Sequence, residues 1–188
     1  NFSPVLQTMP AERPAVFFDR DGTLIHEAHY CAKPSQVRAF DGAPEALVKL
    51  SEAGFALVIV TNQSGIGRGY FTLEDYRRVH EEVLGQLRPA EITAAYHDES
   101  TPDAPSPRRK PSVAMLEEAA REHGLDLSRS WMVGDKTSDI ECGKNAGMRT
   151  VLVETGHGKD HLVCGADAIA TGLVGAVDFI LRQSSCRK

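Results

Sequence analysis

The sequence predicts an α/β fold in which helices cover both faces of a doubly wound, Rossmann-like parallel sheet. The first observation is a series of short, continuously apolar runs, each about as long as a strand that is buried on both faces. The second is that helical spacing separates most runs from the next, as it does in βαβ units. The third is that polar residues directly follow several runs, at the sheet edge where such folds bind ligands.

Composition sets the outer limits on function. The 188 residues are 41% hydrophobic and 25% charged, as in an ordinary globular protein, and predict a single domain over residues 1–188. The net charge of -5 argues against a nucleic-acid partner. No apolar stretch approaches ~18 residues, so no membrane partner is expected, and no signal peptide is visible at the start. We therefore expect a cytoplasmic protein that is a monomer or a small homo-oligomer.

The cysteines do not form a recognisable site. None has a partner at the spacing of a zinc or redox motif, and all are expected to be free thiols of a reducing compartment: Cys31, Cys142, Cys164 and Cys186.

The first half of the chain predicts two strands and two helices. Residues 1–13 are expected to form a loose arm, and residues 24–40 a flap after the first strand. The first helix is expected to be capped by Asp41, with Pro44 in its first turn and Gly54 at its end. Thr72 is expected to cap the second helix, whose apolar stripe is Tyr76, Val79, Val83 and Leu87. The strands are predicted over residues 15–19 and 55–60.

The second half repeats this alternation. Residues 97–108 are rich in proline and predict a loop. The next helix is expected to begin at Arg109–Ser112 and to end at Gly124, and another to begin at residues 134–139. The last helix is predicted over residues 173–181, and the strands over residues 92–96, 131–133 and 150–153 and, more weakly, near Ala168.

Two carboxylates follow the first apolar run. Asp19 and Asp21 are alternate residues at a strand end, so their side chains can face one point in space. Two close carboxylates repel each other unless a cation lies between them or one is protonated. Mg²⁺ is the simplest solution, because it prefers oxygen ligands. The alternative is an ordinary acidic turn, for which Gly22 supplies the backbone freedom.

Polar residues also follow the later runs. The glycine-rich segment 61–69 can offer backbone N–H groups to an anion. Lys110 is expected at a helix start, where a lysine opposes the helix dipole, which indicates an anionic neighbour. Asp135 follows the fourth strand, and Asp139 lies four residues later on the same side of the next helix.

These residues together resemble the haloacid dehalogenase-like (HAD) phosphohydrolases. The first motif is the string from Asp19 to Thr23, and Thr61, Lys110 and the Asp135–Asp139 pair follow in the family's order. The resemblance implies a HAD-like fold with a minimal cap and Mg²⁺-dependent hydrolysis of a phosphomonoester through an aspartyl-phosphate. It implies Asp19 as nucleophile and Asp21 as general acid and then base. Thr61 and Lys110 would bind the phosphate.

The resemblance also implies a metal site. Mg²⁺ would be held by Asp19, the backbone carbonyl of Asp21, and Asp135. Asp139 would act behind the direct ligands or bind the ion through a water molecule; the alternative is an ordinary carboxylate in the first turn of a helix.

Within this family, the resemblance is to D-glycero-D-manno-heptose 1,7-bisphosphate 7-phosphatases and the related histidinol phosphatases. The strings at residues 40–42, 61–69, 109–111 and 133–136 support it. The resemblance implies that Arg109 recognises the distal phosphate of a sugar bisphosphate. The implied substrate-binding residues are Glu27, Ala28, His29, Tyr30, Thr61, Asn62, Gln63, Ser64, Arg109, Lys110 and Lys136.

One segment departs from that pattern. Many members of this subgroup carry a zinc loop of one histidine and three cysteines before the Arg-Lys-Pro string. Here residues 97–108 contain no cysteine, and His97 is the only soft ligand. A lone histidine does not make a zinc site. We therefore expect no structural zinc, and a loop held by its prolines and by local contacts.

The sequence leaves other functions open. The alternatives are a histidinol-phosphate phosphatase, another small sugar-phosphate phosphatase, a nucleic-acid 3′-phosphatase, and a non-catalytic protein that binds a phosphorylated ligand. The expected partner is a small phosphorylated substrate, used in lipopolysaccharide or nucleotide-heptose precursor synthesis. The net charge disfavours the nucleic-acid enzyme, and the intact carboxylates disfavour the non-catalytic protein.

Overall fold

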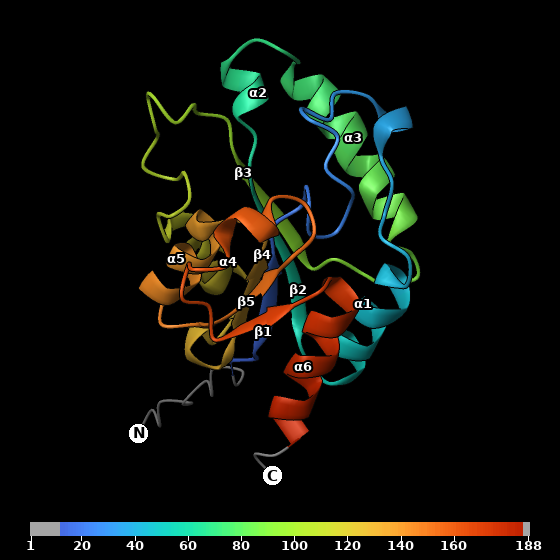
Figure 1. The fold of residues 1–188 in the computed structure, drawn as a ribbon, viewed down its shortest axis with the longest axis vertical. Helices are drawn as coiled ribbons and strands as arrows, with labels where there is room; N and C mark the ends of the chain where they lie inside the picture. The colour runs from blue at the N-terminus through green and yellow to red at the C-terminus, as the bar shows by residue number, and fades with distance from the viewer. Residues whose placement is uncertain (1–11, 186–188) are drawn as a thin grey trace, which may run out of the picture.

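A computed structural model describes residues 12–185, and in it a parallel sheet carries the fold (Figure 1). The sheet has six strands in the order β3-β2-β1-β4-β5-β6. The chain therefore winds outward from β1 first in one direction and then in the other, which confirms the predicted fold class. The strands are β1 (Ala15–Phe18), β2 (Ala56–Asn62), β3 (Ala94–Asp98), β4 (Trp131–Gly134), β5 (Arg149–Val153) and β6 (Ala168–Ala170).

Helices cover both faces of the sheet. One face carries α1 (Ala43–Glu52), α3 (Leu73–Gln86) and α6 (Leu173–Ser185), and α1 and α6 lie side by side in Figure 1. The other face carries α4 (Ala114–His123) and α5 (Thr137–Asn145). A single turn, α2 (Ser64–Gly67), follows β2, and three short 3₁₀ segments occupy Pro34–Gln36, Leu127–Arg129 and Gly158–His161.

The central strand β1 is buried on both sides, as its continuous apolar run predicts. Val16 and Phe18 belong to the core beneath α1, α3 and α6. Ala15 and Phe17 belong to the core beneath α4 and α5. Because successive strand residues point to opposite faces, four apolar residues in a row serve two cores.

Two predicted strands are longer at their carboxyl ends than expected. Thr61 and Asn62 pair with His97 and Asp98 in the register of β2 and β3. The polar segment predicted to begin at Thr61 and the loop predicted to begin at His97 therefore each start with two strand residues. The ladder continues into polar sequence because backbone pairing does not depend on apolar side chains.

Two predictions of helix starts are wrong. Asp41 does not cap α1: the cap position is Gly42, whose φ of 76° suits a glycine, and no side chain bonds there. Lys110 does not lie at a helix start, because α4 begins four residues later, at Ala114. The opposition to a helix dipole therefore gives no reason for the position of Lys110.

Other local signals are confirmed. Thr72 Oγ1 accepts a hydrogen bond from Asp75 N at 3.1 Å, and Asp75 Oδ2 accepts one from Thr72 N at 2.9 Å. This capping box starts α3. Gly124, at a φ of 60°, ends α4.

The predicted N-terminal arm is only partly covered, since residues 1–11 lie outside the described residues, as does Cys186. Arg13 is not loose. Its N–H donates to Gly124 O at 3.1 Å, and its carbonyl accepts from Asp126 N at 3.0 Å.

Cys31, Cys142 and Cys164 are free thiols. Within residues 12–185 no helix combines the length and the apolarity that crossing a membrane would require.

Candidate active site

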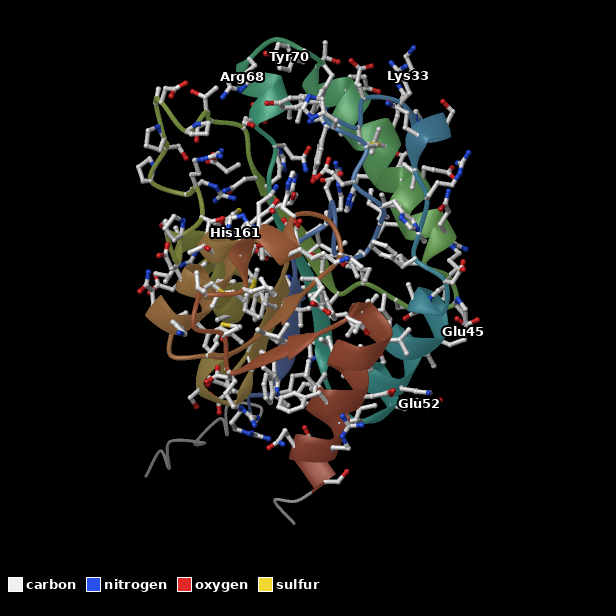
Figure 2. The ribbon with its side chains drawn as sticks, in the orientation of Figure 1. Lys33, Glu45, Glu52, Arg68, Tyr70 and His161 are labelled. Carbon is white, nitrogen blue, oxygen red and sulfur yellow. The ribbon has the colours of Figure 1, made fainter. Side chains whose placement is uncertain are left out.

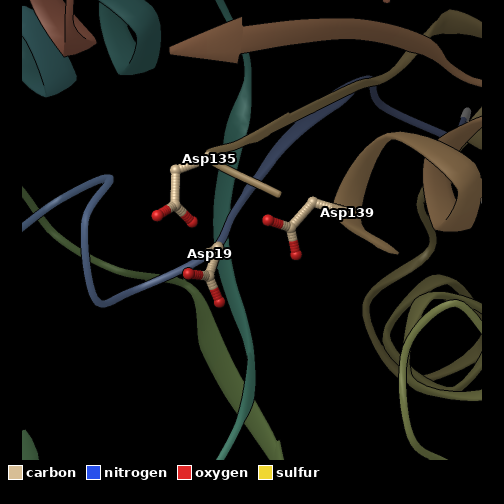
Figure 3. A group of neighbouring side chains, drawn as sticks. All are labelled: Asp19, Asp135 and Asp139. Carbon is tan, nitrogen blue, oxygen red and sulfur yellow. The ribbon is translucent and has the colours of Figure 1, made fainter. Parts of the chain in front are cut away.

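Three carboxylates meet at the carboxyl ends of β1 and β4 (Figure 3). Asp19 follows β1, Asp135 follows β4, and Asp139 lies in the first turn of α5. One oxygen of each lies within 4.8 Å of the others, and all three residues are buried. The strands bring them together, because β1 and β4 are neighbours and Asp19 N donates to Val133 O at 3.0 Å.

Lys110 is the buried cation of this cluster. Its Nζ donates to Asp19 Oδ1 at 2.7 Å and to Val60 O at 2.8 Å, and it lies 2.6 Å from Asp139 Oδ1. Burial alone would lower the pKa of Lys110, but the carboxylates of Asp139 and Asp19 outweigh burial and raise it. The lysine is therefore charged, and it ties Asp19 to Asp139 of α5.

The carboxylates exceed the positive charge available to them. Burial raises the pKa of Asp135 to about 8 and that of Asp19 to about 6. Asp135 Oδ2 accepts from His157 N at 2.8 Å, whereas Asp135 Oδ1 is buried without a hydrogen-bond partner among residues 12–185. A buried oxygen without a partner, next to a second carboxylate, fits a hard divalent cation such as Mg²⁺.

The backbone beside this cluster is fitted closely to it. Gly22 has a φ of 84°, and a Cβ there would lie 2.4 Å from Asp135 Oδ2. Only glycine leaves room for the carboxylate at this turn.

Asp21 is not part of the carboxylate cluster. Its Oδ2 accepts from Arg20 Nε at 2.9 Å and from Gln63 Nε2 at 2.9 Å. Burial raises the pKa of Asp21, but the Arg20 guanidinium outweighs burial and lowers it. The side chain is thus held ionised by Arg20 and Gln63 and points away from the three clustered carboxylates.

Arg20 and Gln63 form a network that sequence reasoning missed in part. Arg20 is completely buried and donates from Nη2 to Gln63 Oε1 at 3.1 Å. Gln63 Nε2 also donates to Thr61 Oγ1 at 2.8 Å. Gln63 was predicted to bind substrate, but here it links Asp21 to Thr61. A charged residue between two aspartates was the only sequence signal for Arg20.

Thr61 and Asn62 take different parts. The Thr61 hydroxyl accepts from Gln63, so its own proton can be donated to an anion. The Asn62 side chain instead braces the backbone of Lys110: Nδ2 donates to Lys110 O at 3.2 Å, and Oδ1 accepts from Lys110 N at 3.1 Å.

Comparisons with known proteins identify the family of this chain. A model of the HAD-hydrolase-like family matches residues 107–175. The D-glycero-D-manno-heptose-1,7-bisphosphate 7-phosphatase of Thermosynechococcus vestitus is 37% identical, over 89% of this chain and 95% of its own. The enzyme of the same name from Chlorobaculum tepidum is 36% identical, over 92% of this chain and 96% of its own. This chain belongs to the HAD-like family of phosphatases.

Solved structures support the same membership. The D,D-heptose 1,7-bisphosphate phosphatase of B. bronchiseptica, crystallised with magnesium and phosphate, superposes with a TM-score of 0.83 at 26% identity. The match covers 90% of this chain and 99% of that one.

The phosphatase has a cavity of about 240 Å³ beside Asp21. Most of the residues predicted to bind substrate line this cavity. They come from the flap, from the end of β2 and the turn after it, and from the start of the segment after β4. Ala28, Thr61, Arg109 and Lys110 do not line it. The lining residues are Asp21, Glu27, His29, Tyr30, Cys31, Asn62, Gln63, Ser64, Gly65, Lys136 and His157.

His157 is a lining residue that sequence reasoning missed. It belongs to the loop after β5, and its Nε2 lies 3.6 Å from Oε2 of Glu27, which also lines the cavity. A polar, glycine-flanked segment directly after an apolar run was the available signal.

The flap is shaped by an uncommon backbone conformation. His29 and Tyr30 have φ values of 47° and 66°, in the left-handed region that side chains rarely adopt. The Tyr30 ring packs edge-on against Tyr70 at 4.8 Å, which joins the flap to the turn after α2. Figure 2 shows Tyr70 and Arg68 beside α2, at the end of the molecule where Lys33 of the flap also lies.

Arg109 lies outside the cavity wall and is half-buried. Its Nη1 donates to Ser100 O at 2.5 Å, and among the described residues its guanidinium makes no ion pair with a carboxylate. Burial lowers the pKa of Arg109 and outweighs the carboxylate of Asp98, which raises it, and the neighbouring Arg68 lowers it further. The remaining donors of its guanidinium suit an anionic ligand.

Proposed function

We propose that this phosphatase removes the 7-phosphate of D-glycero-D-manno-heptose 1,7-bisphosphate through an aspartyl-phosphate on Asp19. The observation that carries the proposal is the buried lysine that bridges Asp19 and Asp139, next to the unpartnered Asp135 Oδ1. This arrangement offers a nucleophile, positive charge for phosphate oxygens and oxygen ligands for a cation. The names of the relatives support the choice of substrate.

The proposed reaction has two steps. An Asp19 oxygen attacks phosphorus, the bond from phosphorus to the sugar oxygen breaks, and that oxygen takes a proton from Asp21. Water then attacks phosphorus, Asp21 takes its proton, and the bond to Asp19 breaks. Thr61 donates to the phosphate oxygens, and the ammonium of Lys110, which already contacts Asp19, Asp139 and Val60 O, neutralises their charge.

Asp21 must first give up its contacts. A proton donor has to be protonated, yet Arg20 and Gln63 hold its carboxylate ionised. We propose that Asp21 takes up a proton from solvent when the substrate fills the cavity and the leaving sugar oxygen replaces the Arg20 contact.

Mg²⁺ is the proposed cofactor, held by Asp19, the carbonyl of Asp21 and Asp135, with Asp139 acting through a water. When bound, it supplies positive charge to the phosphate oxygens. No structural zinc is proposed, and this stays a prediction: metal analysis of the purified protein should find far less than one zinc per chain. A cytoplasmic location and a small phosphorylated substrate as the only partner belong to the same proposal.

Histidinol phosphate is the second candidate substrate. Glu27 lines the cavity and could meet the amine of histidinol. Arg109 favours the bisphosphate, because a guanidinium fork binds a second phosphate and repels an amine.

We expect kcat/KM with Mg²⁺ to favour the heptose bisphosphate over histidinol phosphate by at least about 100-fold, or ~2.7 kcal/mol. Arg109→Ala should remove most of this preference, because the second phosphate loses its partner. Steady-state kinetics on both substrates measures it. Arg121→Ala, at an exposed position on α4, is the matched control and should leave the ratio unchanged. Slow and equal turnover of both substrates would contradict the proposed substrate.

Mg²⁺ should stabilise the fold more at pH 8 than at pH 5. Asp19 and Asp135 have pKa values raised by burial to about 6 and about 8. In the metal-free protein, the free energy of unfolding therefore falls as the pH rises from the ordinary carboxyl pKa of 3.8 to about 8, because both groups must then ionise in a buried site. Mg²⁺ binds the ionised forms, so its affinity rises over the same range.

Thermal unfolding with Mg²⁺ or EDTA measures this effect. The Tm difference between the two should grow from pH 5 to pH 8. Exposed acidic residues that bind Mg²⁺ weakly would give a small difference that does not change with pH, and that result would contradict the assigned site.

A further inference from the structure

Asp98 is a buried carboxylate that the proposed reaction does not use. It ends β3, and its residue is 4% exposed. Its Oδ1 accepts from Ser100 N at 2.9 Å and from the Ser100 hydroxyl, and its Oδ2 accepts from the Ser106 hydroxyl. Two serines thus satisfy the hydrogen-bonding capacity of both carboxylate oxygens.

This cluster closes the loop that leads to Arg109. Ser106 N donates to Ser100 Oγ at 2.9 Å, so the two serines bond to each other as well as to Asp98. Arg109 N donates to Ser106 O at 3.2 Å, and Arg109 Nη1 donates to Ser100 O at 2.5 Å. Ser106 therefore holds the backbone of Arg109 and Ser100 holds its guanidinium, and both serines are hydrogen-bonded to Asp98.

The carboxyl end of β3 is also joined to the glycine-rich segment 61–69. Asp98 O accepts from Gln63 N at 2.7 Å, and Glu99 O accepts from Gly67 N at 3.0 Å. The loop that carries Arg109 is thus fixed relative to α2 and relative to Gln63, which contacts Asp21 and Thr61. A displacement of this loop would change the distance between the two ends of the substrate site.

We propose that Asp98 is a positioning residue that sets the guanidinium of Arg109, through Ser100 and Ser106, at the distance of a second phosphate. This inference rests on the proposed function. Asp98 touches no reacting atom, and it acts by the geometry of its hydrogen bonds.

The test compares Asp98→Ala with wild type on two substrates, the heptose bisphosphate and p-nitrophenyl phosphate, which has no second phosphate. We expect KM for the bisphosphate to rise about 10-fold or more, with kcat/KM for p-nitrophenyl phosphate within about twofold. In an Arg109→Ala background, Asp98→Ala should have almost no further effect, because the two residues act as one unit. Additive effects of the two substitutions would overturn the proposal.

Two further variants separate geometry from charge and from folding. Asp98→Asn keeps the shape and can still bond both serines, so it should restore most of the bisphosphate KM. If Asp98→Asn behaved like Asp98→Ala, the negative charge rather than the geometry would be responsible, and the proposal would be wrong. If Asp98→Ala does not fold, Ser106→Ala replaces it in the same test. Ser106→Ala keeps the buried carboxylate and removes the hydroxyl that bonds to it.

A readout that needs no substrate keeps this test apart from that of the proposed function. In an NMR spectrum, the signal of the Arg109 Nε–H group can be assigned by its loss in Arg109→Ala. This signal should be sharp in wild type and broadened in Asp98→Ala. An unchanged signal would overturn the positioning role even if the enzyme preferred the bisphosphate. A wild-type enzyme without that preference would refute the proposed substrate, while this signal would still decide the role of Asp98.

Discussion

Asp19→Asn is expected to lower kcat by about 10⁴-fold or more on any phosphate ester. An amide oxygen is a poor nucleophile and cannot form the aspartyl-phosphate. Steady-state kinetics with Mg²⁺ on p-nitrophenyl phosphate measures the loss. Acid quenching with labelled substrate should trap a phosphoryl group on wild type and none on the variant.

The variant should remain folded, because Lys110 keeps its contact with Asp139. Asp41→Asn is the matched control, since Asp41 is an exposed carboxylate that caps no helix, and it should leave kcat unchanged. If Asp19→Asn retained the turnover of wild type, Asp19 would not be the nucleophile.

Lys110→Met should lower both activity and stability. Removal of this preorganised positive charge beside the phosphate is expected to lower kcat by about 10²–10³-fold. Without the ammonium, the buried carboxylates of Asp19 and Asp139 lose their direct ion-pair partner and keep only the more distant Lys136, so the free energy of unfolding should fall by about 3–5 kcal/mol at pH 8.

The stability loss should be smaller at pH 5. The ionised carboxylates are the costly species, and protonation of Asp19 at low pH removes part of that cost. Urea unfolding of the metal-free protein at both pH values measures the difference. Lys49→Met, an exposed lysine of α1, is the control and should change stability little at either pH. An equal loss at both pH values would show that packing, rather than charge, is what Lys110 contributes.

The sequence by itself determined the fold class and the order of the chemical motifs. Each continuous apolar run at β1, β2 and β4 could be recognised because a doubly covered strand needs apolar residues on both faces. The Thr72–Asp75 cap and Gly124 are local signals that depend only on near neighbours. Asp19 and Asp135 could be placed together because the ends of parallel strands meet at one edge.

Only the tertiary structure decided how the site residues are used. Lys110 lies before α4 rather than in it. Its position is fixed by ion pairs with residues distant in the sequence, such as Asp19, which lies 91 positions away. The use of Gln63 as a link and the loop closure by Asp98 depend on the register of β2 and β3. Such contacts arise from strand order and pairing, and no periodicity or spacing along the chain encodes them.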